Sequence, residues 1–156
     1  NEYFDTMAMP VERNGGEILK FIGDAMLAVF PLDRPDACGR ALKAAVEARD
    51  AMNVLNTRRR EAGLSLTGYG IALHVGDVMY GNIGAASRLD FTVIGPAVNV
   101  ASRLEALTKE LRRHVLVSGS LAAACGGDPI PLVRLGSFRL RGVGDEVEAW
   151  GLRDDE

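Results

Sequence analysis

Two polar side chains, Asn99 and Arg103, stand four positions apart in the stretch 91–105, FTVIGPAVNVASRLE. This spacing places them one turn apart on the same face of a helix. Arginine offers a rigid fork of donors and asparagine an orientable amide, so together they could clamp a phosphate. The same spacing also fits two solvated residues on an ordinary amphipathic helix. Spacing alone favours that second interpretation.

A second pair of charges, Lys20 and Asp24, lies in the stretch 17–30, where two apolar runs flank Gly23 and Asp24. A Gly–Asp pair between two apolar runs is typical of a tight β-hairpin turn. A carboxylate held at such a tip could bind a hard cation. An aspartate at a turn more often serves the turn itself, and without other support that interpretation is favoured.

The remaining patterns predict the elements that would position these side chains. Helices are expected over 1–13, 34–62 and from Pro96 to about residue 113, with Gly63 as a C-cap. Strands are expected within 64–84, at 91–94, 115–117, 133–140 and 147–152, with a connector at 85–90 and a frayed tail at 153–156. The order predicts one α+β domain over 1–156, an antiparallel sheet with helices on one face.

Composition and charge argue against two classes of function, nucleic-acid binding and membrane insertion. The net charge is −3, which argues against a dedicated nucleic-acid binder. No apolar run approaches the ~20 residues that span a bilayer, so no membrane contact by this domain is expected. Cys38 and Cys125 lack metal-ligand spacing and predict buried thiols in the reducing cytoplasm. His74 has no second ligand nearby and is interpreted as structural.

Three motifs resemble class III nucleotidyl cyclase catalytic domains, the adenylyl/guanylyl cyclase family. They are GEILKFIGD at 16–24, HVGDVMYGNIG at 74–84 and the stretch 91–105, in the family's order. The resemblance implies a ferredoxin-like core and a homodimer whose active sites lie between subunits. It also implies two divalent ions, Mg²⁺ or Mn²⁺, held by two aspartates. In the implied reaction, the ribose 3′-hydroxyl of the nucleotide attacks its own α-phosphate and pyrophosphate leaves.

The resemblance also assigns roles to individual residues. Asp24 matches the second metal-binding aspartate. Lys20 matches the residue that reads the purine, and Thr92 occupies its companion position, as in one subgroup of adenylyl cyclases. Since guanylyl cyclases carry Glu and usually Cys at these two positions, Lys20 with Thr92 implies ATP over GTP.

Three further residues match the machinery that handles the phosphates and ribose. Asn99 corresponds to the residue that orients the ribose or helps align the reacting groups. Arg103 corresponds to the residue that stabilises charge on the α-phosphoryl oxygens in the transition state. Arg141 lies where many members carry a lysine that binds the terminal phosphates, and arginine keeps that charge.

The chain departs from the family pattern at its start. The first metal aspartate and its strand should precede the first helix, and Asp5, inside that helix, is a poor substitute. We therefore expect a fragment with an incomplete metal site and no activity of its own. We also expect another segment, for example from a neighbouring chain, to occupy the position of the absent strand, because central strands leave unpaired backbone groups when lost.

Two alternatives to an adenylate cyclase remain open. One is a catalytically silent cyclase-like module that binds nucleotide or a partner, favoured by the absent aspartate. The other is a guanylate cyclase, which Lys20 opposes. The Thr92 subgroup also resembles cyclases that respond to bicarbonate. Sensor or membrane segments could lie upstream of Asn1.

Overall fold

The computed structural model describes residues 2–85, 88–126 and 129–155, and within 80–93 it describes the backbone alone. Its elements, in chain order, are α1 (Glu2–Arg13), β1 (Glu17–Ile22), β2 (Ala25–Val29), α2 (Ala37–Glu61), β3 (Ile71–Leu73), β4 (Met79–Ala85), β5 (Arg88–Ile94), α3 (Pro96–Leu111), β6 (Val115–Ser118), α4 (Gly119–Ala124), β7 (Leu132–Phe138) and β8 (Val147–Leu152). The α+β class predicted from the sequence is confirmed.

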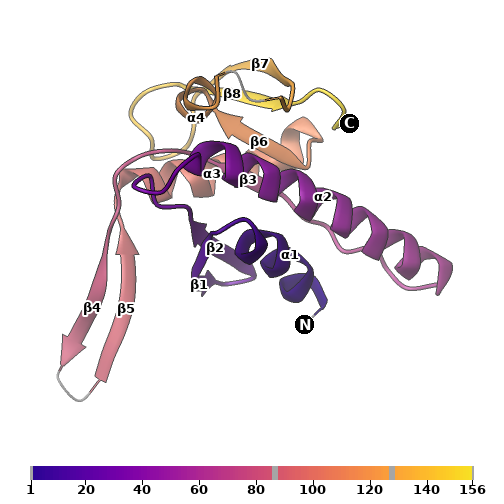
Figure 1. Cartoon of the computed structure of the whole chain (residues 1–156), viewed down its shortest axis with the longest axis horizontal. Coiled ribbons are helices and arrows are strands. Elements are labelled where there is room, and N and C mark those ends of the chain that lie inside the picture. The colour runs from indigo at the N-terminus through magenta and orange to yellow at the C-terminus, as the bar shows by residue number, and fades with distance from the viewer. Residues whose placement is uncertain (1, 86–87, 127–128, 156) are drawn as a thin grey trace.

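The strands form three separate sheets (Figure 1). A four-stranded sheet has the order β3-β6-β8-β7, and two hairpins, β1-β2 and β4-β5, stand apart from it. The pairings are antiparallel except that β3 and β6 run parallel. The expectation of an antiparallel sheet therefore holds for most of the molecule, and β3–β6 is the exception. The β4-β5 hairpin extends away from the rest of the chain (Figure 1).

Helices cover both faces of the four-stranded sheet, which corrects the expectation of helices on one face. Val115 and Val117 share a core cluster with α2, whereas Leu116 between them packs in the cluster of α3. Alternate residues of a strand point to opposite faces, so α2 and α3 lie on opposite sides of β6. The near-continuous apolar run of β6 is typical of a strand buried on both faces.

The C-terminus of α2 and the N-terminus of α3 both lie where the local sequence predicts them. At the end of α2, Gly63 adopts a φ of +73°, and the amides of Gly63 and Leu64 donate to the carbonyls of Arg60 and Arg59. This pair of bonds is a Schellman cap, which confirms Gly63 as the stop signal. Pro96 begins α3 directly after Gly95, as expected for proline at a first helical position.

Residues 153–155 are folded, so the prediction of a frayed tail is wrong for them, and Glu156 lies outside the described residues. Asp155 is 2 % exposed, and its carboxylate accepts from the backbone amides of His114 and Val115, both at 2.8 Å. Asp154 accepts from Arg49 of α2 at 2.9 Å. The sequence pattern missed this because the tail is held by polar bonds to distant residues and carries no apolar periodicity.

The connector expected at 85–90 is also shorter than predicted. Strand β4 continues to Ala85 and β5 already begins at Arg88, with Ala85 opposite Arg88 in the ladder. Residues 86–87 lie outside the described part of the chain. Residues 88–90, RLD, gave no sign of a strand because they lack the β-branched and aromatic residues that are enriched in strands.

Candidate functional site

The hairpin β1-β2 presents Asp24 at its tip, as the sequence predicted. Gly23 supplies a φ of +60° at the turn, which glycine adopts without steric cost. Asp24 is exposed. Lys20 lies in β1 opposite Leu27, beside a register shift, and its side chain is half-buried. The hairpin therefore carries both charges, with the carboxylate at the turn and the ammonium on the strand.

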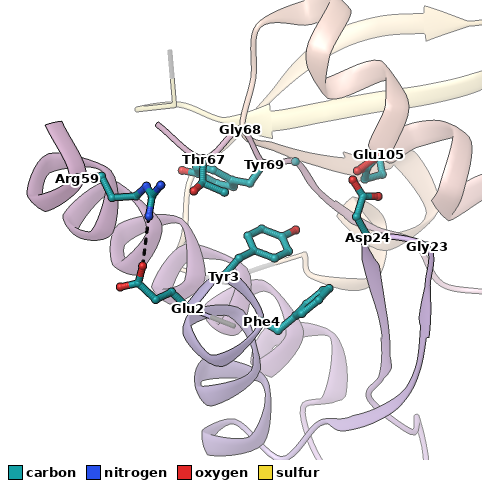
Figure 2. A pocket seen from close by; sticks show the side chains of 11 residues that line it. Glu2, Tyr3, Phe4, Gly23, Asp24, Arg59, Thr67, Gly68, Tyr69 and Glu105 are labelled. Carbon is teal, nitrogen blue, oxygen red and sulfur yellow. Dashed lines mark hydrogen bonds and ion pairs between the residues drawn. The ribbon is translucent and has the colours of Figure 1, made fainter. Parts of the chain in front are cut away.

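A pocket of about 610 Å³ opens beside this tip. Figure 2 shows that its walls come from the start of α1, the hairpin turn, the last turns of α2, the segment before β3 and α3. The residues that line it are Glu2, Tyr3, Phe4, Gly23, Asp24, Arg59, Thr67, Gly68, Tyr69, Gly70 and Glu105. The pocket thus separates the hairpin sheet from the segment that enters β3.

Close packing of the chain before β3 against α3 forms one wall of the pocket. A Cβ built on Gly70 would collide with the side chain of Thr108, and Thr108 is 4 % exposed. The Thr108 hydroxyl donates to the carbonyl of Glu105 at 2.6 Å. A glycine at position 70 is therefore required for the segment to lie so near α3 at Glu105.

Negative charge gathers where the hairpin tip faces α3. In Figure 2 the carboxylates of Asp24 and Glu105 point toward one another, with the Tyr3 hydroxyl facing them from α1. Burial and then the charge of Asp24 raise the pKa of Glu105. Burial, followed by the charges of Glu105 and Asp24, raises the pKa of Tyr3. Sequence reasoning missed Glu105 and Tyr3, although Glu105 closes the stretch 91–105 that it singled out.

The opposite rim of the pocket carries an ion pair. Arg59 donates to the Glu2 carboxylate at 3.2 Å (Figure 2) and to the carbonyl of Ser65 at 2.6 Å. Tyr69 stacks on His114, with ring centroids 4.6 Å apart, and its hydroxyl donates to Asn53. These bonds hold Arg59 and Tyr69 in place on this wall of the pocket. They do not involve Asp24 or Glu105, which lie on the opposite wall (Figure 2).

Among the described side chains, those of Asn99, Arg103 and Arg141 do not line this pocket. Asn99 and Arg103 project from α3, and Arg141 lies in a turn after β7; all three side chains are exposed. Thr92 pairs with Gly81 in the β4-β5 hairpin, and its side chain lies outside the described residues. Whether Lys20 and Thr92 share a cleft therefore stays a prediction.

The donor chemistry at the hairpin tip suits a hard divalent cation only in part. Asp24 offers the carboxylate oxygens that Mg²⁺ and Mn²⁺ prefer. Within the described residues, however, no group of three or more His, Cys, Asp or Glu side chains is placed to hold a metal ion. The predicted ions fit Asp24 as one ligand and would need further oxygen ligands.

The α+β fold and the three sequence motifs agree with a nucleotide cyclase domain. The family model for the adenylate and guanylate cyclase catalytic domain matches residues 1–153, and the chain belongs to this family. It is 40 % identical over 125 residues to an adenylate cyclase of Anabaena cylindrica, covering 78 % of this chain and 24 % of that protein. It is 32 % identical over 144 residues to adenylate cyclase 1 of Rhizobium meliloti, covering 91 % and 22 %.

Solved structures agree with this assignment. The adenylyl cyclase CyaB from P. aeruginosa superposes with a TM-score of 0.81 at 27 % identity, over 100 % of this chain and 81 % of that one. The guanylyl cyclase Cya2 superposes with a TM-score of 0.76 at 29 % identity, over 97 % and 78 %. The chain spans about a quarter of the length of the curated relatives it matches. In the part of the chain that the structure describes, no helix is long and apolar enough to cross a membrane.

Proposed function

We propose that this chain is the catalytic domain of an adenylate cyclase that converts ATP to cyclic AMP and pyrophosphate. Membership of the cyclase family carries the proposal, and two relatives named adenylate cyclase support it. Lys20 favours ATP, because an ammonium group can donate to a ring nitrogen of adenine. Because one similar structure is a guanylyl cyclase, the fold alone does not discriminate between the nucleotides.

In the proposed reaction the ribose 3′-oxygen bonds to the α-phosphorus while the bond from that phosphorus to the bridging oxygen of pyrophosphate breaks. Arg103 would donate to the α-phosphoryl oxygens as their charge grows, and Asn99 would hold the ribose. Arg141 would bind the terminal phosphates, and Lys20 with Thr92 would hold the adenine. A divalent cation, when bound, would activate the hydroxyl and neutralise the leaving group.

The exposure of Asn99, Arg103 and Arg141 supports a site completed by a second copy of the chain. None of these three side chains faces the pocket that contains Asp24. An arginine expected to stabilise a transition state acts best where water is excluded. We propose that a head-to-tail homodimer brings the α3 residues of one subunit over the hairpin of the other.

Among the described residues, Asp24 has too few neighbouring carboxylates to hold a metal ion. This supports the proposal that the metal site needs a second aspartate from an upstream segment. The pocket beside Asp24 lies between the hairpin and the segment that leads into β3. Both β2 and β3 are edge strands in their sheets, and edge strands readily accept another strand. We propose that an extended segment bearing an aspartate fills this pocket in the active enzyme.

The decisive experiment compares the 156-residue chain with the same chain extended upstream by its natural sequence. Each is assayed with ATP and with GTP in Mg²⁺ or Mn²⁺. We expect cyclic AMP from the extended chain alone. Robust cyclic AMP from the 156 residues would disprove the incomplete site. Cyclic GMP as the main product would support the guanylate cyclase, and nucleotide binding without turnover would support the silent module.

A substitution tests the mechanism within the extended chain. We expect Arg103→Ala to lower kcat by about 100-fold or more, the typical cost of losing a transition-state donor, with the fold unchanged by circular dichroism. Lys109→Ala is the matched control, because Lys109 is an exposed cation on the same helix with no assigned role. Unchanged turnover in Arg103→Ala would remove the proposed role.

A further inference from the structure

Two cysteines from distant parts of the sequence meet in one core cluster. Cys38 is the second residue of α2, and Cys125 is the C-cap of α4. Both pack with Ala41, Val117 and Leu121 in the cluster between α2 and the four-stranded sheet. Both are free thiols, and the Cys125 side chain lies near enough to Cys38 to act on the pKa of its thiol.

The surroundings of this pair leave one thiol reachable and the other enclosed. Cys125 is 8 % exposed, whereas Cys38 is only half-buried. A soluble oxidant can therefore meet the Cys38 sulfur first, and the Cys125 sulfur is then its nearest thiol partner. Neither cysteine lines the pocket beside Asp24, so this pair is separate from the candidate active site.

We propose that Cys38 and Cys125 are a modification site, at which a small-molecule disulfide such as glutathione disulfide converts the two thiols to an intramolecular disulfide. The Cys38 thiolate attacks one glutathione sulfur and releases a first glutathione thiol. The Cys125 thiolate then attacks the Cys38 sulfur and releases the second glutathione. One protein S–S bond forms, one glutathione S–S bond breaks, and two electrons and two protons pass to glutathione.

The cross-link would join the first turn of α2 to the residue that ends α4. Cys38 lies in the first turn of α2, which follows the hairpin that presents Asp24, separated from it by the loop 30–36. Cys125 ends the helix that follows β6 of the four-stranded sheet. Oxidation would therefore link the start of α2, the element that follows the β1-β2 hairpin, to the end of α4. Burial of Cys38, with Asp36 nearby, raises its pKa, so exchange is slow and the equilibrium is the quantity to measure.

The test is a redox titration of the 156-residue chain in glutathione buffers, once under native conditions and once in urea. The intramolecular disulfide is identified by mass, from the loss of two hydrogen atoms and from the cross-linked tryptic peptide. Since native packing holds the sulfurs together, we expect half-oxidation of the native chain at a glutathione ratio at least ~10-fold more reducing than for the unfolded chain.

Two variants and a structural readout make the result decisive. Cys38→Ser and Cys125→Ser should each yield only a glutathione adduct, and the oxidised wild type should keep its native circular dichroism. Half-oxidation at the same ratio with and without urea would overturn the proposal. A native chain that ends as a glutathione adduct, as a disulfide-linked dimer or unfolded would also overturn it.

Discussion

The carboxylates of Asp24 and Glu105 face each other where the hairpin turn meets α3 (Figure 2). Burial is the larger reason for the raised pKa of Glu105, and the negative charge of Asp24 is the second. Two like charges brought together outside bulk water make ionisation harder for the more buried group. This relationship joins the predicted metal-binding aspartate to a residue that the motif comparison did not single out.

We expect Asp24→Asn to lower the pKa of Glu105, because the substitution removes the repelling charge and leaves burial in place. The pKa of Tyr3 should fall as well, since Asp24 also raises it. Carbon-detected NMR of the carboxyl groups and ultraviolet titration of the tyrosine measure the two shifts. Glu2→Gln is the control, because Glu2 lines the same pocket yet contributes to neither shift. An unchanged pKa of Glu105 in Asp24→Asn would contradict the juxtaposition.

We expect Asp155→Ala to destabilise the chain by about 3 kcal/mol, since the backbone amides of His114 and Val115 would lose their acceptor in a buried place. The free energy of unfolding is measured by urea denaturation. Asp154→Ala is the matched neighbour: its side chain is 78 % exposed, and Arg49 keeps its pairing with Asp50. Its loss should be clearly smaller. Equal losses would mean that Asp155 does not anchor the tail.

We expect Gly95→Ala to destabilise the start of α3. Gly95 has a φ of +144°, and an added Cβ would lie 3.1 Å from the carbonyl oxygen of Asp77. Strain of this kind costs about 1–3 kcal/mol. Gly144→Ala is the control, because nothing lies within 4 Å of its Cβ position. Thermal unfolding measures both variants, and a Gly95→Ala chain as stable as Gly144→Ala would show that the backbone here is unstrained.

We expect His74 to make the folded chain less stable as the pH falls. Burial lowers its pKa below the ordinary 6.5, so the unfolded chain binds a proton more readily than the folded one. The contribution of neutral His74 is therefore fully present above about pH 6.5 and declines as the pH falls below that value. In the folded chain, Nδ1 of the ring lies 2.8 Å from the Ser118 hydroxyl.

Thermal unfolding of the wild type and of His74→Gln from about pH 8 to about pH 5 measures this contribution. Other titrating groups act in both proteins, so the difference between the two curves isolates His74. The wild type should lose more stability than the variant as the pH falls. Parallel curves would show that His74 is not held neutral in the folded chain.

Much of the candidate site followed from local sequence. The Gly–Asp turn between two apolar runs sufficed to place Asp24 at a hairpin tip, because tight turns depend on a few adjacent residues. The Gly95–Pro96 junction likewise predicted where α3 begins, and the four-residue spacing predicted that Asn99 and Arg103 share one face of it. The strand at 115–117, the antiparallel pair of β7 and β8, and Gly63 as a helix stop also followed from local sequence.

The tertiary structure decided what lies between these elements. Periodicity does not tell which face of a sheet a helix covers, so only the packing showed that α2 and α3 lie on opposite sides of β6. The anchoring of Asp155 and the meeting of Cys38 and Cys125 in one core cluster join residues far apart in sequence, where no local preference acts. The sequence by itself determined the family and its candidate residues, because these depend on residue type and spacing. The pocket that sets Glu105 and Tyr3 beside Asp24 exists only after α1, the hairpin and α3 have packed together.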